Sequence, residues 1–446
     1  MPELPTEPIR GVPEPAAPPP PAAPPPDLHL DRLQAMPQAE LLALARDSGA
    51  DHGAAHRYET IFRIAREHYR RGGQQLHQGA LEVLPDGYGF LRSSAYAYAP
   101  AIDDVYVAPA FVKRGGLKPG DTITGVIRPP REGEKYFALL KVESVNHGLP
   151  EKALVRKSFE DLTPLHPHKR LFLEWSPTDF ESRIINLFTP IGKGQRGLIV
   201  APPRTGKTIL LAKIAHAIET NHPEVMVIVL LIDERPEEVT NMKRSIRGEV
   251  VASCFDEGPD RHKQVTEMVL EKAKRLVEYG KDVVVLVDSM TRMGRAYNNL
   301  TGPRGRTMTG GMDVEALQAP KMFFGSARQI EHGGSLTILA TALIETGSKM
   351  DEVIFEEFKG TGNMELYLDR SVGNRRIFPA LDINKSGTRK EELILDREEL
   401  RRLLQLRKMI QEIRDPGEVV EYLIDRMKKY RTNAELLMSV KVGDAG

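Results

Sequence analysis

One short segment, residues 198–208, constrains the fold of this chain more than any other. Four apolar residues, Leu198 to Ala201, precede Pro-Pro-Arg-Thr-Gly-Lys-Thr, and a helical pattern follows over residues 209–218. A strand that passes through such a loop into a helix directs backbone N–H groups and the helix N-terminus at phosphate. Lys207 is then placed to meet the β and γ phosphates, and the Thr208 hydroxyl to bind Mg²⁺. The segment predicts a P-loop for ATP and magnesium, although Ala201 stands where the usual pattern has glycine.

The C-terminal half repeats the pattern of an apolar run followed by a long helix. The runs are Leu198–Ala201, Val225–Ile232, Val283–Val287 and Leu336–Leu343. Strands buried on both faces read as continuous apolar runs, so we expect a mostly parallel sheet covered by helices.

Two of these runs end in acidic residues. Residues 283–287 lead into Asp288, which we expect to hold Mg²⁺, and residues 225–232 lead into Asp233, Glu234 and Arg235. The carboxyl ends of parallel strands meet at one edge, where an acid can orient the attacking water. Glu234 is therefore the predicted general base, although each acid alone would more often be a turn or cap residue.

The composition indicates the cellular compartment of the protein but does not indicate its substrate. The chain has 62 basic and 62 acidic residues, so its net charge argues for no particular partner. The single cysteine, Cys254, excludes an internal disulfide framework. No apolar run approaches the ~20 residues that span a bilayer. We expect a soluble cytoplasmic protein with no membrane association.

Changes in composition and in hydrophobic pattern divide the chain into five parts. Residues 1–26, with twelve prolines after Met1, predict a disordered tail, and residues 27–75 predict a small helical subdomain. Short β-rich pieces over residues 76–146 predict an OB-type barrel. A connector over residues 147–188 then leads to the α/β ATPase domain, residues 189–446.

The predicted barrel contains aromatic residues at alternate positions. Tyr88, Phe90 and Arg92 fall on one face of a strand, and Tyr106 and the 134–136 turn could complete a site. Bases stack on such a platform while arginine meets phosphate. Glu134 could accept a hydrogen bond from a cytosine amino group, which would favour C-rich strands. The alternative is that these aromatics are half-buried core residues.

Two glycine-rich segments in the ATPase half, residues 302–312 and 346–351, lack apolar periodicity. In a ring they could line a pore in which Arg306 and Lys349 contact the nucleic-acid backbone. Arg376 and Arg389 are candidates for the cation that phosphoryl transfer needs near the γ-phosphate. For all four, an ordinary solvated charge or surface ion pair is the alternative.

Several longer motifs resemble the family of the bacterial transcription termination factor Rho. They are residues 201–208, residues 231–238 (Leu-Ile-Asp-Glu-Arg-Pro-Glu-Glu), Thr309-Gly310-Gly311, residues 347–352 (Gly-Ser-Lys-Met-Asp-Glu), residues 386–392 (Ser-Gly-Thr-Arg-Lys-Glu-Glu), and, in the barrel, residues 86–92 and 128–133. The resemblance covers about residues 28–435 and implies a RecA-like P-loop ATPase.

The resemblance also implies a homohexameric ring that binds C-rich nascent RNA on its barrels and threads RNA through its pore. ATP hydrolysis would drive 5′-to-3′ translocation, helicase activity and release of transcripts from RNA polymerase, with elongation factors as further partners. Arg389 would reach a neighbour's ATP with Arg376 assisting, and Phe378 would stack near the adenine. The implied nucleotide set is Arg204, Thr205, Gly206, Lys207, Thr208, Ile209, Arg235 and Phe378. The implied RNA set is Tyr88, Phe90, Arg92, Tyr106, Glu134, Tyr136, Arg306, Thr309, Gly310, Gly311 and Lys349.

The chain departs from the family pattern at Arg306, where lysine is common, and at Arg204-Thr205, where Lys-Ala is common. The proline-rich tail also has no counterpart there. Two other functions compete with the RNA motor: a rotary or export ATPase that acts on protein, and a passive RNA-binding protein with a decayed ATPase. The aromatic barrel argues against the first, and the intact set of Lys207, Glu234, Asp288 and Arg389 argues against the second.

Overall fold

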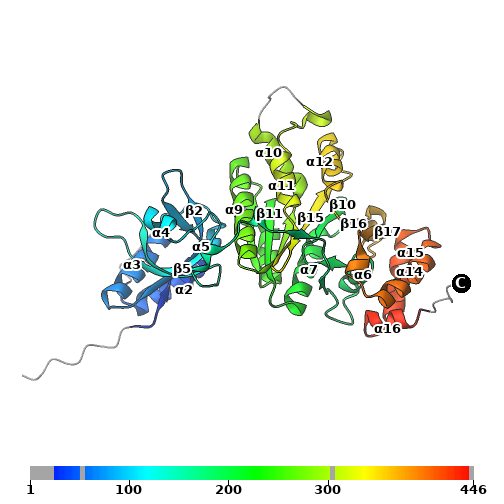
Figure 1. Cartoon of the computed structure of the whole chain (residues 1–446), viewed down its shortest axis with the longest axis horizontal. Helices are drawn as coiled ribbons and strands as arrows, with labels where there is room; N and C mark the ends of the chain where they lie inside the picture. The colour runs from blue at the N-terminus through cyan, green and yellow to red at the C-terminus, as the bar shows by residue number, and fades with distance from the viewer. Residues whose placement is uncertain (1–24, 51–55, 302–306, 441–446) are drawn as a thin grey trace, which may run out of the picture.

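A computed structural model of the chain describes residues 25–50, 56–301 and 307–440. Nearly all of the predicted tail, and Arg306, lie outside the described residues. The described chain runs from a small β-barrel through a large α/β domain to a group of C-terminal helices (Figure 1).

The N-terminal part is a barrel with three helices packed on it. The helices are α1 (Leu30–Ala35), α2 (Gln38–Asp47) and α3 (Arg57–Arg70), and the strands are β1 (Leu28–His29), β2 (Gln75–Val83), β3 (Gly89–Arg92), β4 (Val105–Val107), β5 (Thr122–Arg128) and β6 (Phe137–Val145), with α4 (Pro109–Arg114) between β4 and β5. The spatial order is β1-β2-β3-β4-β6-β5, and pairing of β2 with β5 closes the barrel. The predicted OB-type barrel is confirmed.

The helical subdomain has no core of its own. Leu41 and Ile61 of the helices share one buried cluster with Leu81 of the barrel. The rings of Phe62 and Phe137 stack with their centroids 4.9 Å apart, and β1 pairs with the start of β2. The helices and the barrel therefore form a single packed unit.

The large domain is built on a mostly parallel sheet, as predicted. Its main path is β12 (Glu249–Cys254), β11 (Met226–Glu234), β13 (Asp282–Asp288), β15 (Ser335–Leu343), β10 (Arg196–Ala201), β16 (Met364–Leu368) and β17 (Leu381–Thr388). All neighbours on this path are parallel except β16 and β17. Strands β12, β16 and β17 were not among the predicted apolar runs, because they lie toward the edges and carry polar residues.

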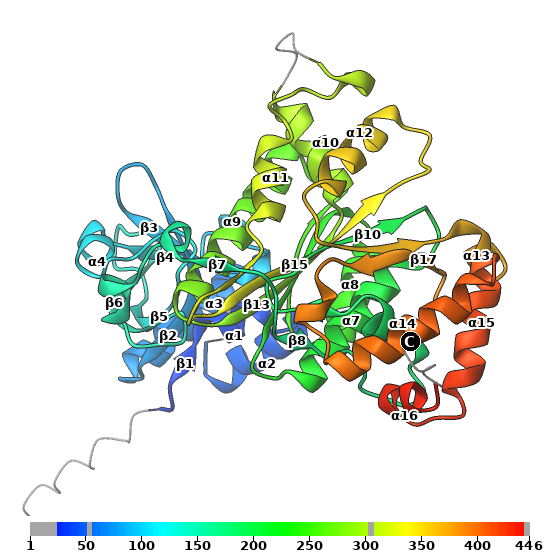
Figure 2. The same ribbon diagram turned by 45° about the vertical axis from the view of Figure 1, so that its right-hand side comes forward.

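Helices cover both faces of the sheet (Figure 2). One buried cluster holds residues of α6 (Phe180–Phe188), α7 (Lys207–Asn221), α8 (Pro236–Ser245), α14 (Arg397–Gln411), α15 (Pro416–Met427) and α16 (Asn433–Met438). The other holds residues of α9 (Pro259–Glu278), α10 (Met290–Thr301), α11 (Gln318–Gly325) and α12 (Lys349–Lys359). The Asp415 side chain caps α15 by accepting from the Glu418 N–H at 2.9 Å.

The predicted connector is structured. It contains α5 (Lys152–Val155), a 3₁₀ turn at Phe159–Asp161, β7 (Pro164–Leu165), β8 (Arg170–Leu171) and α6; β7 pairs with β14 (Arg328–Ile330), and β8 with β9 (Ile191–Gly192). Ile184, Ile185 and Phe188 of α6 are buried in the ATPase core. The second half of the connector thus belongs to the large domain, because its amphipathic helix needs that core to cover its apolar side.

A buried ion network joins the barrel to the large domain. The Arg156 guanidinium donates to Asp121 of the barrel at 2.7 Å and lies 3.2 Å from Glu278 of α9. All three side chains are fully buried. Tyr98 of the barrel and Glu249 and Lys272 of the large domain bond to one another nearby.

Candidate nucleotide and RNA sites

The P-loop has the backbone that phosphate binding requires. Gly206 lies in the left-handed region, with φ of 84°, which glycine adopts without steric cost, and α7 begins at Lys207. The Thr205 hydroxyl donates to the Pro202 carbonyl at 2.7 Å and ties the loop to itself. Ala201 is the fully buried last residue of β10 and pairs with Leu343, so this position is a strand residue that has no need of glycine.

The acidic residues predicted from the strand ends meet the P-loop lysine. Lys207 Nζ lies 2.8 Å from Glu234 Oε1 and 2.6 Å from Asp288 Oδ2. The Thr208 hydroxyl lies 3.3 Å from Asp288 Oδ2. The two carboxylates are 4 % and 0 % exposed, so the site can hold charge where solvent screens it little. Three strand ends therefore converge at one sheet edge, as predicted.

Glu234 is held as a carboxylate. Burial raises its pKa, but the charge and hydrogen bond of Lys207 and the charge of Arg292 oppose burial, and the net effect places the pKa below its ordinary value. A carboxylate in this state can accept a proton from, or orient, a water molecule at neutral pH.

Two residues of this site were not predicted from the sequence. The Thr341 hydroxyl of β15 donates to Asp288 Oδ1 at 2.8 Å, and Arg292 of α10 lies 3.6 Å from Glu234 and 3.8 Å from Asp233. A polar residue that interrupts the apolar run 336–343 was the available signal for Thr341. The sequence contains no comparable signal for Arg292, because the position of Arg292 depends on how α10 packs.

An apolar cavity of about 230 Å³ adjoins the P-loop. Its lining includes Gly206, Ile209, Phe378 and Glu181. Ile209 and Phe378 are 65 % and 49 % exposed, which is high for apolar residues and suits a flat ligand placed between them. The cavity brings two predicted nucleotide residues together beside the loop. Arg204 and Arg235 are both exposed at this edge, where Arg235 is the cap residue of α8.

The two candidate arginines lie at opposite edges of the sheet. Arg376 is exposed in the turn before β17, close behind Gly373, whose Cα faces the backbone of Arg204 and Thr205. Arg389 follows Thr388, which pairs with Met364, the first residue of β16. Because β17 runs antiparallel to β16, Arg389 lies at the amino edge, away from the P-loop of its own subunit.

The four aromatic residues predicted for the RNA site form one cluster. Tyr88 and Tyr106 have centroids 5.7 Å apart, and Phe90 lies 4.9 Å from Tyr136 and 6.0 Å from Tyr106. Phe90 is buried at the base, Tyr88 and Tyr106 are half-buried, and Tyr136 is exposed. The predicted shared face is present, with Phe90 as its floor. We call this group the aromatic platform.

The charged residues beside the platform are engaged within the protein. Arg92 is 6 % exposed, donates to Glu82 at 2.6 Å and to Asp104, and packs over the Phe90 ring. This geometry argues against the phosphate contact expected for Arg92. Glu134 is exposed but accepts two hydrogen bonds from Arg128, which lower its pKa to about 2.

The predicted pore segments touch each other. A Cβ on Gly310 would come within 2.7 Å of the Met350 nitrogen, so the 3₁₀ turn Thr309–Gly311 packs on the start of α12. Gly310 has φ of 80°, which favours glycine. Lys349 is the first residue of α12, after the Ser348 cap, and it is exposed like Thr309 and Gly311. Residues 349–351 are therefore helical, where we expected a loop.

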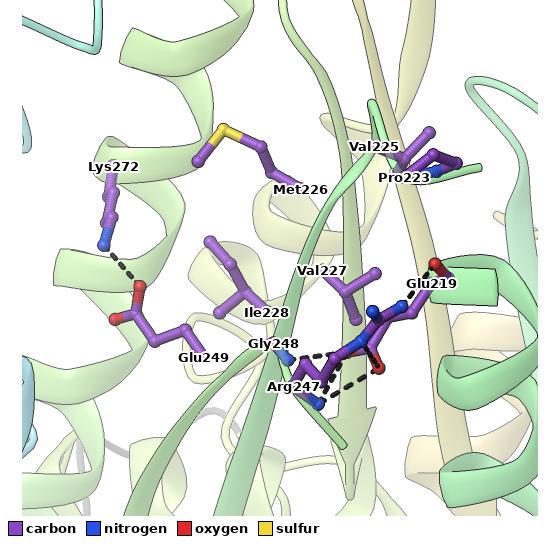
Figure 3. A pocket seen from close by; sticks show the side chains of 10 residues that line it. All are labelled: Glu219, Pro223, Val225, Met226, Val227, Ile228, Arg247, Gly248, Glu249 and Lys272. Carbon is purple, nitrogen blue, oxygen red and sulfur yellow. Dashed lines mark hydrogen bonds and ion pairs between the residues drawn. The ribbon is translucent and has the colours of Figure 1, made fainter.

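A separate cavity lies at the amino edge of the sheet (Figure 3). It is lined by apolar residues at the start of β11, with Glu219, Arg247, Gly248, Glu249 and Lys272 around them. The Glu219 carboxylate accepts from the Gly248 N–H at 2.6 Å. This cavity is remote from the P-loop, which lies at the carboxyl edge.

Fold and site together define a P-loop ATPase joined to an OB-type RNA-binding domain. Residues 77–151 match the family described as "Rho termination factor, RNA-binding domain", and residues 182–388 match "ATP synthase alpha/beta family, nucleotide-binding domain". The chain is 55 % identical over 418 residues to the transcription termination factor Rho of Pseudomonas aeruginosa, covering 93 % of this chain and 100 % of that one. It is 53 % identical over 420 residues to Rho of Escherichia coli, with the same coverage. The chain belongs to the transcription termination factor Rho family.

A solved structure supports the fold of the large domain. An ATPase of the type III secretion system of pathogenic bacteria superposes with a TM-score of 0.53 at 22 % identity and covers 63 % of this chain and 87 % of that one. This likeness concerns the fold alone. Among the described residues, no helix is long and apolar enough to cross a membrane.

Proposed function

We propose that this chain is an ATP-driven RNA translocase and helicase that binds C-rich nascent RNA and terminates transcription by releasing transcripts from RNA polymerase. The observation that carries the proposal is the pairing, in one chain, of a P-loop lysine 2.6–2.8 Å from two buried acids with a barrel of the Rho RNA-binding family. Relatives that match this chain over their whole length and are named transcription termination factor Rho support the cellular role.

In this proposal the carboxyl edge performs hydrolysis. Lys207 and the N–H groups of residues 204–208 bind the phosphates, and Glu234 orients the attacking water and takes its proton. The Thr208 hydroxyl and Asp288, which are hard oxygen donors 3.3 Å apart, would hold Mg²⁺. The metal would neutralise charge on the phosphates. Phe378 and Ile209 would hold the adenine, and Arg235 would meet the γ-phosphate from the start of α8.

Arg389 serves a neighbouring subunit in this proposal. It lies at the opposite edge from its own P-loop, so a head-to-tail ring is the arrangement that brings it to an ATP. Arg376 lies on the side of its own P-loop and would act within its own subunit. The proposed assembly is a homohexameric ring in the cytoplasm.

RNA is contacted at two places. On the barrel, bases stack on Tyr88, Tyr106 and Tyr136 over Phe90, while Arg92 and its partners support that floor. Glu134 would accept from a cytosine amino group with its remaining oxygen lone pairs. In the pore, Lys349 and Thr309–Gly311, with Arg306, would follow the RNA backbone, because exposed glycines allow close approach.

An export ATPase that acts on protein is the competing function, because a P-loop domain of this fold is also found in an ATPase of the type III secretion system. The aromatic platform favours RNA, because a protein-directed ATPase has no need of a surface for base stacking.

The experiment is steady-state ATP hydrolysis by the purified protein without nucleic acid, with poly(C) RNA, and with single-stranded DNA of the same sequence. Strong stimulation by the RNA alone is the expected result. Equal rates in all three would overturn the proposal and favour the protein-directed ATPase.

A further inference from the structure

A second feature of the barrel domain is a cleft between α3 and the loop that joins β5 to β6. It has a volume of about 290 Å³ and is lined by Phe62, Arg63, Arg66, Pro129, Pro130, Arg131, Glu134 and Lys135. We call it the basic cleft. Four of these residues are cations and one is an anion, so the lining is strongly positive although the whole chain has no net charge.

Acidic residues that line the cleft do not neutralise its positive charge. The single acid, Glu134, is held by the bidentate pair with Arg128, which adds a fifth cation at the rim. Arg66 and Lys135 are exposed, and neither forms a hydrogen bond or ion pair with a described residue. Two guanidinium or ammonium groups are therefore free to bind an anion.

Arg63 points more directly to a ligand. Its Nη1 atom is buried and has no hydrogen-bond partner among the described residues, while Nη2 lies 4.0 Å from Glu59. A buried donor without a hydrogen-bond partner destabilises the fold. An anion in the cleft would supply that partner.

The basic cleft adjoins the aromatic platform through a shared loop. Glu134 and Lys135 line the cleft, and the next residue, Tyr136, belongs to the platform. Phe137 then enters the core and stacks on Phe62 of α3, which fixes the helix that carries Arg63 and Arg66 against this loop. The distance from one feature to the other is therefore set by packing within the domain.

We propose that the basic cleft binds the phosphate backbone of the same single-stranded RNA whose bases stack on the aromatic platform. The inference rests on the platform proposed above. A stacked strand brings phosphates to the domain surface, and Arg92, which was expected to neutralise them, is buried in its own ion pairs. Arg63 and Arg66, with Arg131 and Lys135, are the cations that the fold places next to the platform instead.

The test is the salt dependence of binding of a short fluorescein-labelled oligo(C) RNA to the full-length protein, measured by anisotropy between about 50 and 200 mM KCl. The double variant Arg63→Gln/Arg66→Gln removes two phosphate contacts. The slope of log affinity against log salt should fall by about 1.4, and the affinity at about 0.1 M salt by about 25-fold, because each single-strand contact releases ~0.7 of a counterion. Lys135→Gln should lower the slope further.

Two controls separate this effect from a general loss of charge or fold. Arg63→Lys/Arg66→Lys keeps both charges and should retain most of the slope. Arg397→Gln/Lys428→Gln removes the same net charge from exposed positions on the C-terminal helices and should bind RNA like the wild type. Thermal unfolding checks that each variant is folded.

The possible results separate a failure of this inference from a failure of the proposed RNA binding on the aromatic platform. If wild type binds oligo(C) and the glutamine double variant keeps both slope and affinity, the basic cleft does not bind RNA, while the platform proposal stands. If wild type does not bind oligo(C), the platform proposal falls and this inference falls with it.

Discussion

At the scale of single residues, the site depends on short contacts to Asp288 and Glu234. Lys207 contacts both carboxylates, and Arg292 contacts Glu234. Asp288 is also contacted by Thr208, at the start of helix α7, and by Thr341 of strand β15. Each contact joins a different element of the large domain. Small changes at these atoms should therefore alter chemistry more than stability.

Glu234→Gln keeps the size of the side chain but removes the carboxylate that we propose as the general base. We expect ATP affinity within a few-fold of wild type and turnover at least about 100-fold lower, as for loss of a general base. Nucleotide binding by fluorescence and single-turnover hydrolysis measure the two effects. Asp233→Asn is the matched control, since Asp233 is adjacent and half-exposed. Near-wild-type turnover in Glu234→Gln would remove Glu234 from its role.

Thr341→Val deletes the hydroxyl that donates to Asp288 with little change in volume. Because partners of this kind orient metal ligands, we expect the Mg²⁺ concentration for half-maximal hydrolysis to rise by about 10-fold or more. Thr337→Val is a control on the same strand at the opposite edge, where the Thr337 hydroxyl accepts from the Gly194 N–H at 2.8 Å. An unchanged Mg²⁺ requirement in Thr341→Val would show that Asp288 does not need this contact.

At the scale of elements, strand β2 of the barrel carries a buried titratable group. His77 is fully buried, both its ring nitrogens lack hydrogen-bond partners among the described residues, and burial lowers its pKa to about 4 despite the opposing charge of Asp31. The unfolded chain protonates this histidine near pH 6.5, before the folded chain does. Stability contributed by neutral His77 is therefore present above pH 6.5 and lost as the pH falls toward 4.

We expect the free energy of unfolding to fall by up to roughly 3 kcal/mol over this range through His77 alone. His77→Leu should remove most of that dependence. Chemical denaturation at pH 7.5, 6 and 5 compares the two proteins. Parallel pH profiles would mean that His77 does not titrate in the folded barrel.

The aromatic platform is the second element with a direct test. The variants Tyr88→Ala and Phe90→Ala, alone and combined, should weaken poly(C) binding, since each stacked base contributes ~1–3 kcal/mol. Nucleotide binding at the distant P-loop should not change. Phe90 is buried, so Tyr88→Ala separates stacking from packing. Undiminished poly(C) affinity in both single variants would assign these rings to the core.

At the scale of the whole molecule, the sheet separates the two halves of the proposed catalytic apparatus. Lys207, Glu234 and Asp288 lie at the carboxyl edge, and Arg389 lies at the amino edge after an antiparallel strand. One subunit thus presents a phosphate site on one side and an exposed arginine on the other. The proposed ring joins each pair across a subunit boundary.

Lys207→Ala and Arg389→Ala should each abolish RNA-stimulated hydrolysis when measured alone. When the two variants are dissociated, mixed and reassembled, we expect activity to return, because Lys207→Ala subunits donate Arg389 to the intact phosphate sites of their neighbours. No recovery in mixed assemblies, verified by mass, would place Arg389 outside the neighbour's site.

The sequence by itself determined the elements whose signals are local. Continuous apolar runs identified four buried strands, Gly206-Lys207-Thr208 located the phosphate loop, and acids directly after two runs located Glu234 and Asp288, because residues at strand ends share an edge in any parallel sheet. The alternation of Tyr88 and Phe90 likewise placed them on one barrel face.

Tertiary structure alone decided what depends on contacts between distant segments. Burial of Arg92 against Glu82 and Asp104, the bond from Thr341 to Asp288, the docking of α6 into the ATPase core, and the opposite edges of Arg376 and Arg389 all follow from packing or strand direction. Alternation along a strand specifies a face, but only the neighbouring strands determine whether a charge on that face meets solvent, RNA or another side chain.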